Sequence, residues 1–248
     1  MLKITNLEFN IYKNTTLQKN ILNKINLNIN NGEFAMIIGG NGAGKSTLFN
    51  IISGFLFADE GNIRLNDKDI TSFNKSKRSK LISIVMQDPK VSTIENMTIL
   101  ENMALALARS ENRSLMPFFR NNRKEIFKQK LSLLNMNLEN RLDDLVSNLS
   151  GGQRQALSLC MSLLGACELL LLDEICAALD PCMAELVMEL SYKISKEQNL
   201  TTIMITHNME HVLKFADKLF IMKNGTICQQ IDKQGLKNMQ VIDLVKCI

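Results

Sequence analysis

The stretch Gly39-Gly40-Asn41-Gly42-Ala43-Gly44-Lys45-Ser46-Thr47 follows the apolar run from Phe34 to Ile38 and decides the fold. It fits the pattern G-x-x-x-x-G-K-[ST], in which small residues let backbone N–H groups turn toward a phosphate chain. We expect a strand before it and a helix over Thr47 to Phe55 after it, because the positive end of that helix then faces the anion. The stretch predicts a nucleoside triphosphate site, with Lys45 on the β- and γ-phosphates and the Ser46 hydroxyl on magnesium.

The composition is that of an ordinary packed protein, with 46% hydrophobic and 22% charged residues over 248 positions. The net charge of +4, from 29 basic and 25 acidic side chains, is too small to indicate nucleic acid as a partner. The amino terminus lacks the pattern of a signal peptide, and no apolar window is long enough to span a membrane, so we expect a cytosolic chain. Six cysteines without a C-x-x-C pair predict reduced, structural thiols.

The region before the loop is predicted to form strands. Leu2 to Ile4 and Ile25 to Ile29 alternate apolar and polar residues, which is typical of half-buried antiparallel strands. Between them lies the polar segment from Phe9 to Asn20, which carries Tyr12. Tyr12 is either an aromatic that stacks on a purine base or an ordinary half-exposed strand residue.

After the loop, the apolar run from Leu81 to Met86 predicts a strand that ends on Gln87. Open α/β sheets bind their ligands at such strand ends. The basic run from Lys75 to Lys80 is predicted to be a solvated face, with lipid head groups or a partner protein as the alternatives.

A change to helical character from about Ser92 to Leu164 indicates an inserted helical subdomain, with helices over Asn96 to Ala108 and Arg123 to Leu134. The segment between these helices, 109–123, either faces a membrane or partner or packs its aromatic residues under the helices. Near the end of the subdomain, Ser150-Gly151-Gly152-Gln153 opens a further helix with Ser150 as N-cap. This helix start is a second candidate anion site.

Two further strands end in polar residues. The run from Leu169 to Leu172 predicts a buried strand that ends in Asp173 and Glu174, and burial of two carboxylates requires a compensating charge such as Mg²⁺ with a triphosphate. Asp173 is the candidate for holding magnesium through a water, and Glu174 is the candidate general base for the attacking water.

The β-branched run from Thr201 to Thr206 predicts another buried strand, which ends on His207. A single histidine is usually structural, but its place at a strand end makes His207 a candidate hydrogen-bond donor to a γ-phosphate. His211 is expected on a helix face without a catalytic role.

With these motifs in this order, nearly the whole chain resembles the ATP-binding subunit of an ABC transporter. The resemblance implies an α/β fold with a P-loop ATPase core, an antiparallel β subdomain and an inserted α-helical subdomain. It implies one domain over 1–248, in which 1–87 and 166–248 form the nucleotide-binding core. Residues 88–165 would form the helical subdomain with the signature motif.

The resemblance also implies an ATPase that uses ATP and Mg²⁺, and it assigns roles residue by residue. Lys45, Glu174 and His207 would be catalytic, and Ser46, Gln87 and Asp173 would hold the metal. Tyr12 would stack on adenine, with Phe9 as the alternative, and Gln87 would sense a membrane subunit. The phosphate loop would supply further nucleotide contacts from Gly39, Gly40, Asn41, Gly42, Ala43, Gly44 and Thr47. Across a dimer, the signature motif would contact the nucleotide of the other subunit through Ser150, Gly151, Gly152 and Gln153. Asp180 would couple the two nucleotide sites.

The implied partners are a second nucleotide-binding subunit, in a homodimer or pseudo-dimer, and transmembrane permease subunits at the cytoplasmic face of the membrane. Within the family the chain is similar to bacterial uptake ATPases for amino-acid-like solutes, which admits an extracytoplasmic solute-binding protein. An exporter subunit and a soluble ABC ATPase are the alternatives. One departure from the family pattern, Ile175-Cys176 after Glu174, bears on how Glu174 is positioned.

Overall fold

The computed structural model describes residues 1–108 and 121–247, so the segment 109–123 lies almost wholly outside the described residues. The strands are β1 (Leu2–Ile11), β2 (Lys19–Ile29), β3 (Phe34–Gly39), β4 (Glu60–Leu65), β5 (Lys68–Asp69), β6 (Ile82–Val85), β7 (Leu169–Asp173), β8 (Thr201–Ile205), β9 (Lys218–Lys223) and β10 (Thr226–Asp232). The α-helices are α1 (Lys45–Ser53), α2 (Lys75–Arg78), α3 (Pro89–Ser92), α4 (Ile99–Ala108), α5 (Asn121–Ser132), α6 (Gly151–Ser162), α7 (Pro181–Glu197), α8 (Met209–Phe215), α9 (Lys233–Lys237) and α10 (Val241–Cys247).

A six-stranded sheet forms the centre of the molecule, with strand order β10-β9-β3-β8-β7-β6. All its pairs are parallel except β9 with β10, which form an antiparallel hairpin. The carboxyl ends of β3, β8 and β7 therefore lie next to one another at one edge, where parallel sheets place ligands. This neighbourhood brings together residues from three distant parts of the sequence.

Strand β3 is buried on both faces, as expected for a strand inside a parallel sheet. Its residues Phe34, Met36 and Ile38 belong to a core shared with helices α6, α7 and α8. Ala35 and Ile37 belong to a second core shared with α1 and with β1, β2 and β4. The strand that leads into the phosphate loop is thus held by packing from both sides.

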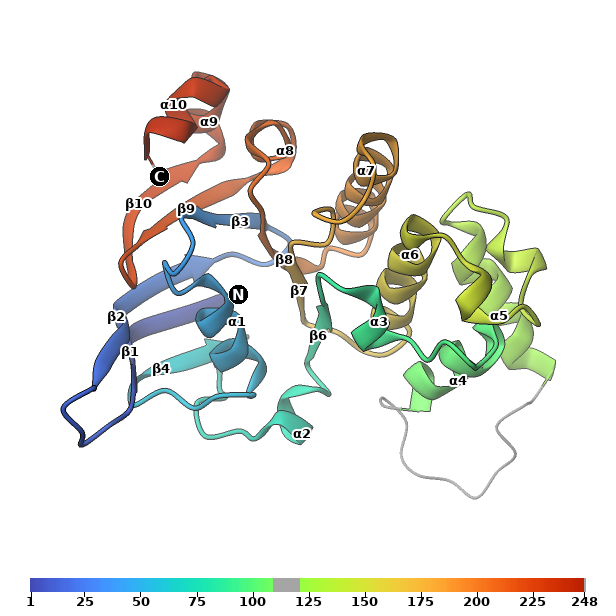
Figure 1. Cartoon of the computed structure of the whole chain (residues 1–248), viewed down its shortest axis with the longest axis horizontal. Coiled ribbons are helices and arrows are strands. Elements are labelled where there is room, and N and C mark those ends of the chain that lie inside the picture. Colours follow the sequence, from blue (N-terminus) through green and yellow to red (C-terminus); the bar gives the residue numbers. More distant parts are fainter. Residues whose placement is uncertain (109–120, 248) are drawn as a thin grey trace.

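The second sheet is antiparallel, in the order β2-β1-β4-β5, and lies on one side of the molecule in Figure 1. Here the predicted strand limits were too short, because β1 reaches Ile11 and β2 begins at Lys19. Strand β1 pairs with β4 as far as Glu8 and with β2 as far as Ile11, and this pairing extends it into the predicted polar segment that begins at Phe9. Phe9 therefore lies within β1 and is half buried.

Helices α4, α5 and α6 form the helical region on the opposite side of Figure 1. Helices α4 and α5 start three and two residues from their predicted starts, at Ile99 and Asn121. Helix α1 is displaced by two residues from the predicted Thr47 to Phe55, because Gly54 adopts a left-handed conformation (φ 82°) and caps the helix there. The predicted order of strand, loop and helix is confirmed.

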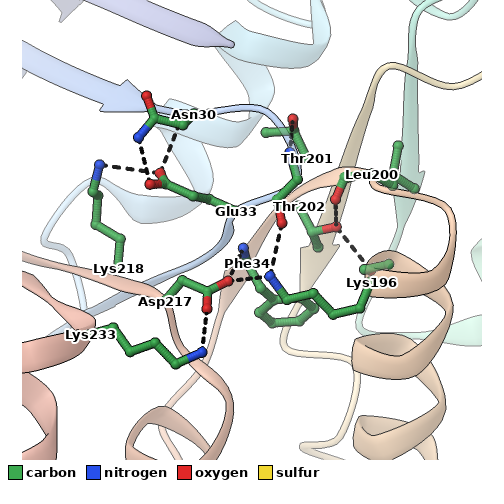
Figure 2. A network of polar contacts seen from close by, with 12 residues as sticks. Asn30, Glu33, Phe34, Lys196, Leu200, Thr201, Thr202, Asp217, Lys218 and Lys233 are labelled. Carbon is green, nitrogen blue, oxygen red and sulfur yellow. Dashed lines mark hydrogen bonds and ion pairs between the residues drawn. The ribbon is translucent and has the colours of Figure 1, made fainter.

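A network of charges closes the amino-terminal edge of the six-stranded sheet (Figure 2). Asp217, which precedes β9, accepts hydrogen bonds from the Phe34 amide (2.9 Å), from Lys196 of α7 and from Lys233 of α9 (2.8 Å). Lys196 Nζ also donates to the Gly32 carbonyl, at 2.8 Å. Burial alone would raise the pKa of Asp217, but these hydrogen bonds outweigh it and hold the pKa below 3.8.

Candidate functional site

The phosphate loop connects the carboxyl end of β3 to α1. Gly44 is the N-cap of α1 with φ 99°, a conformation that strains any residue with a side chain, and a Cβ there would lie 2.8 Å from Leu22 Cδ2 and would have to displace it. The cap makes no side-chain hydrogen bond, and the first turn of α1 holds no acidic residue. The amide groups at this helix end are therefore left for an external anion.

Lys45 lies inside the loop and is buried. Its Nζ donates to the carbonyls of Gly39 (2.7 Å) and Gly40 (3.1 Å), which folds the loop around the ammonium group. Burial lowers the pKa of Lys45, although the charges of Glu174 and Asp173 act in the opposite direction. A phosphate chain in the loop would supply the counter-charge that this buried ammonium needs.

The two predicted carboxylates stand at the end of β7, beside β8. The Glu174 amide donates to the carbonyl of Ile205 in β8, at 3.1 Å, and Glu174 adopts a positive φ of 47°. Its Oε1 lies 2.9 Å from His207 Nε2. The structure thus brings together the carboxylate of Glu174 and the imidazole of His207 at the ends of two neighbouring strands.

Asp173 precedes Glu174 as the last residue of β7. Burial and the neighbouring Glu174 raise the pKa of Asp173, while Lys45 acts in the opposite direction. A cation beside the two carboxylates would offset the burial of Asp173 and its repulsion by Glu174. The two carboxylates therefore fit a hard divalent ion, which prefers oxygen ligands. Two exposed side chains can add further oxygen ligands. They are Ser46, in the first turn of α1, and Gln87, in the bend after β6.

The unusual pair Ile175-Cys176 is accommodated by packing. Ile175 is buried in the larger core, and Cys176 Sγ donates to the carbonyl of Ala184 in α7, at 3.4 Å. Burial raises the pKa of Cys176 to about 12, so its thiol stays neutral. Both residues hold the backbone after Glu174 in place.

The signature residues form the start of α6. Ser150 and Gln153 make a reciprocal capping box, with the Gln153 amide on Ser150 Oγ (3.3 Å) and the Ser150 amide on Gln153 Oε1 (3.2 Å). A Cβ on Gly152 would lie 2.3 Å from Met183 Cε, so glycine permits the close approach of α6 and α7. Gly151 is exposed at the first position of the helix. In Figure 1, α6 is well separated from α1, so the signature motif is not brought to the chain's own phosphate loop.

Two further predicted nucleotide contacts, Tyr12 and Asp180, lie in loops. Tyr12 is 66% exposed with φ 52°, in a turn closed by a hydrogen bond from Thr15 Oγ1 to its carbonyl (2.6 Å). This exposure makes Tyr12 a better candidate than the half-buried Phe9 for stacking on a base. Asp180 caps α7 by accepting from the Met183 amide, at 3.1 Å. The roles assigned to Tyr12, Asp180 and the other loop residues remain predictions.

Sequence reasoning missed several residues that support the site. Gln155 Nε2 donates to the Met86 carbonyl (3.1 Å), just before Gln87, and Lys13 forms an ion pair with Asp59 beside the Tyr12 turn. No local sequence signal marks these contacts, because each joins segments that are distant in the chain. Of the described residues, none belongs to a helix that is both long and apolar enough to cross a membrane.

Comparison with known proteins identifies the family. The profile of the family "ABC transporter" matches residues 22–177. A tyrosine transport ATP-binding protein of Clostridioides difficile is 39% identical over 246 residues, which cover 99% of this chain and 98% of the relative. The phosphonates import ATP-binding protein PhnC of Fusobacterium nucleatum is 33% identical over 212 residues, which cover 84% of this chain and 85% of the relative.

A solved structure of the ATP-binding cassette MJ0796, described as dimeric, in a post-hydrolysis state and bound to ADP and Pi, is similar in fold. It has a TM-score of 0.81 and 26% sequence identity, and the match covers 95% of this chain and all of the other. The chain belongs to the ABC transporter family and is an ATP-binding subunit with ATPase activity.

Proposed function

We propose that ATP binds at the phosphate loop and is hydrolysed by water that Glu174 activates as general base. The observation that carries this proposal is the 2.9 Å contact between Glu174 Oε1 and His207 Nε2, at the strand ends beside Lys45. Lys45 binds the β- and γ-phosphates, and His207 holds the γ-phosphate while it keeps the carboxylate of Glu174 oriented. The remaining residues from Gly39 to Thr47 wrap the phosphate chain, and Tyr12 covers the adenine.

Asp173, Ser46 and Gln87 are proposed to hold Mg²⁺. The ion would neutralise charge on the phosphates when bound. The raised pKa of Asp173 supports this role, because a carboxylate beside a second carboxylate is stabilised in its charged form by a cation. The protein's own residues would hold the phosphates and place one water in line with the bond between the β- and γ-phosphates.

The variant Glu174→Gln tests the base. It keeps the size of the side chain and one accepting oxygen but cannot act as a base, so turnover is expected to fall by about 10² to 10⁴ while the Kd for ATP is kept. Glu210→Gln, an exposed glutamate of α8, is the matched control and should hydrolyse ATP normally. Normal phosphate release by Glu174→Gln would refute the assignment.

We further propose that two subunits close head to tail around two nucleotides. The capping box at Ser150 uses the amides of Ser150 and Gln153 and leaves those of Gly151 and Gly152 for an anion, and this helix start lies apart from α1. Both observations support a phosphate that belongs to another chain. The related cassette MJ0796 is described as dimeric, which supports this arrangement. In such a dimer Ser150, Gly151, Gly152 and Gln153 reach the nucleotide of the opposite subunit, and Asp180 couples the two sites.

The membrane subunit is proposed to dock in a cavity of about 570 Å³ that is lined by Met86, the residue before Gln87. Strand β6 forms one wall, and residues of α4 and α6 form the other. The rim is apolar and exposed, with Phe55, Val91, Ile94 and Leu105. Dimer closure on ATP would move this cavity and so act on a permease at the cytoplasmic face of the membrane.

Purification of the chain from its native membranes, in detergent with ATP, tests the partner. Recovery of a multi-span permease is expected, and Leu105→Asp should release it because a charge would enter the apolar rim. Ile126→Asp, on the exposed side of α5, is the control that should keep the complex. Recovery of ribosomes or nucleic acid instead would favour a soluble ABC ATPase and refute the transport role.

The direction and cargo of transport are proposed from the relatives. Two of them are named for transport of tyrosine and import of phosphonates, which supports import of a small, amino-acid-like solute over export. A solute-binding protein outside the membrane would complete such an importer. Uptake of labelled aromatic amino acids by cells with and without the chain is the measurement, and equal uptake would refute this cargo.

A further inference from the structure

Arg78 departs from the predicted solvated basic run. The structure places the run in α2 and the turn after it, with Lys75, Lys77 and Lys80 exposed, but the Arg78 side chain is only 1% exposed. Burial lowers the pKa of Arg78, while Asp69 acts in the opposite direction. Among the described residues no carboxylate forms an ion pair with it, so the cost of burying this charge must be met by other groups.

Backbone carbonyls accept hydrogen bonds from the guanidinium and so compensate for its burial. Arg78 Nη1 donates to the carbonyls of Ile51 and Ile52 (2.9 Å for Ile52), in the last turn of α1. Nε and Nη2 donate to the carbonyls of Phe73 (3.0 Å) and Thr71 (2.8 Å), in the segment before α2. The rigid fork of the guanidinium thus ties the carboxyl end of α1 to a second segment.

The end of α1 is suited to this cation. The last turn of α1 contains no basic residue of its own, and Arg78 supplies the positive charge that the negative end of a helix dipole favours. The fit is tight, because a Cβ on Gly54 would lie 2.9 Å from Arg78 Cδ. Gly54 and Arg78 therefore fix the helix end together.

The opposite end of the same helix holds Lys45 and Ser46. With 9 residues, α1 is only about 13.5 Å long, so a tilt at its carboxyl end moves its first turn as well. We propose that Arg78 is a positioning residue for ATP binding, which holds α1 so that Lys45 and the loop amides meet the phosphates. This inference rests on the proposed phosphate-binding role of Lys45.

The same anchor borders the proposed docking cavity. Lys75 and Ser79, on either side of Arg78, line this cavity, and so do Ser53 and Phe55 at the end of α1. A segment bound there contacts both elements that Arg78 joins. The cavity is thereby connected to the phosphate loop through α1, in addition to its connection through β6 to Gln87.

The test compares Arg78→Met with Lys77→Met, an exposed neighbour in the same helix, and uses calorimetry with ATP and Mg²⁺ at a temperature well below each unfolding midpoint. Arg78→Met removes the charge and the four hydrogen bonds, and the Kd for ATP is expected to rise about 10- to 100-fold. Lys77→Met should match the wild type. A purely structural role would lower the unfolding midpoint but leave the Kd of the folded protein unchanged, and that result would overturn the inference.

Two further variants keep the outcome decisive. Arg78→Lys restores the charge but not the fork, so partial recovery of ATP affinity is expected; if Arg78→Met does not fold, a wild-type Kd for Arg78→Lys overturns the inference. Lys45→Met separates the two proposals. If it leaves ATP binding intact, the proposed phosphate site is wrong, whereas if it weakens binding and the folded Arg78 variants do not, only the inference about Arg78 is wrong.

Discussion

The network around Asp217 allows a quantitative prediction about stability. The change is Asp217→Ala, which removes the acceptor shared by Lys196, Lys233 and the Phe34 amide (Figure 2). These three donors come from α7, from α9 and from the start of β3, so one carboxylate joins three elements. Its removal leaves the Phe34 amide without its partner in a residue that is fully buried.

The expected loss follows from two contributions. An unsatisfied buried amide costs about 1 to 3 kcal/mol. A buried ion pair broken on one side costs about 3 to 5 kcal/mol, but the Lys196 side chain is 33% exposed and Lys233 is 56% exposed, so solvent recovers most of that cost. Together these give a loss of about 3 kcal/mol, or a fall in Tm of about 6 to 12 °C for a chain of this size.

The assay is equilibrium unfolding in urea, followed by circular dichroism at pH 7. The matched control is Lys193→Ala on the same helix, whose pair with Glu197 spans 3.9 Å between side chains that are 64% and 56% exposed. That pair contributes about 0.5 kcal/mol or less, and lysine and alanine both favour helix. Equal unfolding midpoints for the two variants would refute the reasoning.

The pH dependence provides a second check on Asp217. Because its folded pKa lies below the ordinary 3.8, the carboxylate stabilises the fold above that value, and the stabilisation is lost as pH falls through the folded pKa. The difference in unfolding free energy between wild type and Asp217→Asn should therefore be constant near neutral pH and shrink below about pH 3.8. A difference that persists unchanged at lower pH would contradict the assigned direction.

Three other predictions concern the site. Ser150→Ala should destabilise α6 by about 1 kcal/mol and stop turnover, yet keep the Kd for ATP of the isolated chain, and a weakened Kd would show that Ser150 serves its own subunit. His207→Ala should lower kcat about 10²-fold or more in a phosphate-release assay, while an unchanged kcat would exclude a contact with the γ-phosphate. In the native protein at pH 8, iodoacetamide should label the exposed Cys182 but spare Cys160 and Cys176, whose pKa values are raised to about 12 by burial. Mass spectrometry of the labelled peptides is the measurement, and labelling of Cys160 or Cys176 before Cys182 would contradict the prediction.

Much of the site could be predicted from sequence because its residues stand at strand ends. The phosphate loop, Asp173-Glu174 and His207 each follow an apolar strand, and parallel pairing brings such ends together without further information. The contact between Glu174 and His207 is a direct product of this rule. The limits of α1 were predicted two residues too late. Gly54 ends the helix as a C-cap, but the predicted helix ran on to the apolar Phe55 after it.

Other features depend on contacts that no local pattern contains. Arg78 lies in a run of lysines, and only the carbonyls of α1 and of the segment before α2 decide that it turns inward. Strand β1 extends to Ile11 because β2 pairs with it as far as Ile11 and β4 as far as Glu8, although the segment that begins at Phe9 is largely polar. In each case tertiary pairing outweighs local composition.

The separation of Ser150 on α6 from the phosphate loop on α1 has a genetic consequence. If two chains close head to tail as proposed, each nucleotide is held by the Lys45 of one chain and the Ser150 of the other. A cell that expresses only a Lys45 mutant or only a Ser150 mutant would then lack any complete site. A cell that expresses both alleles would assemble mixed pairs in which one site carries both defects and the other carries none. Two loss-of-function alleles of one gene could in this way complement each other.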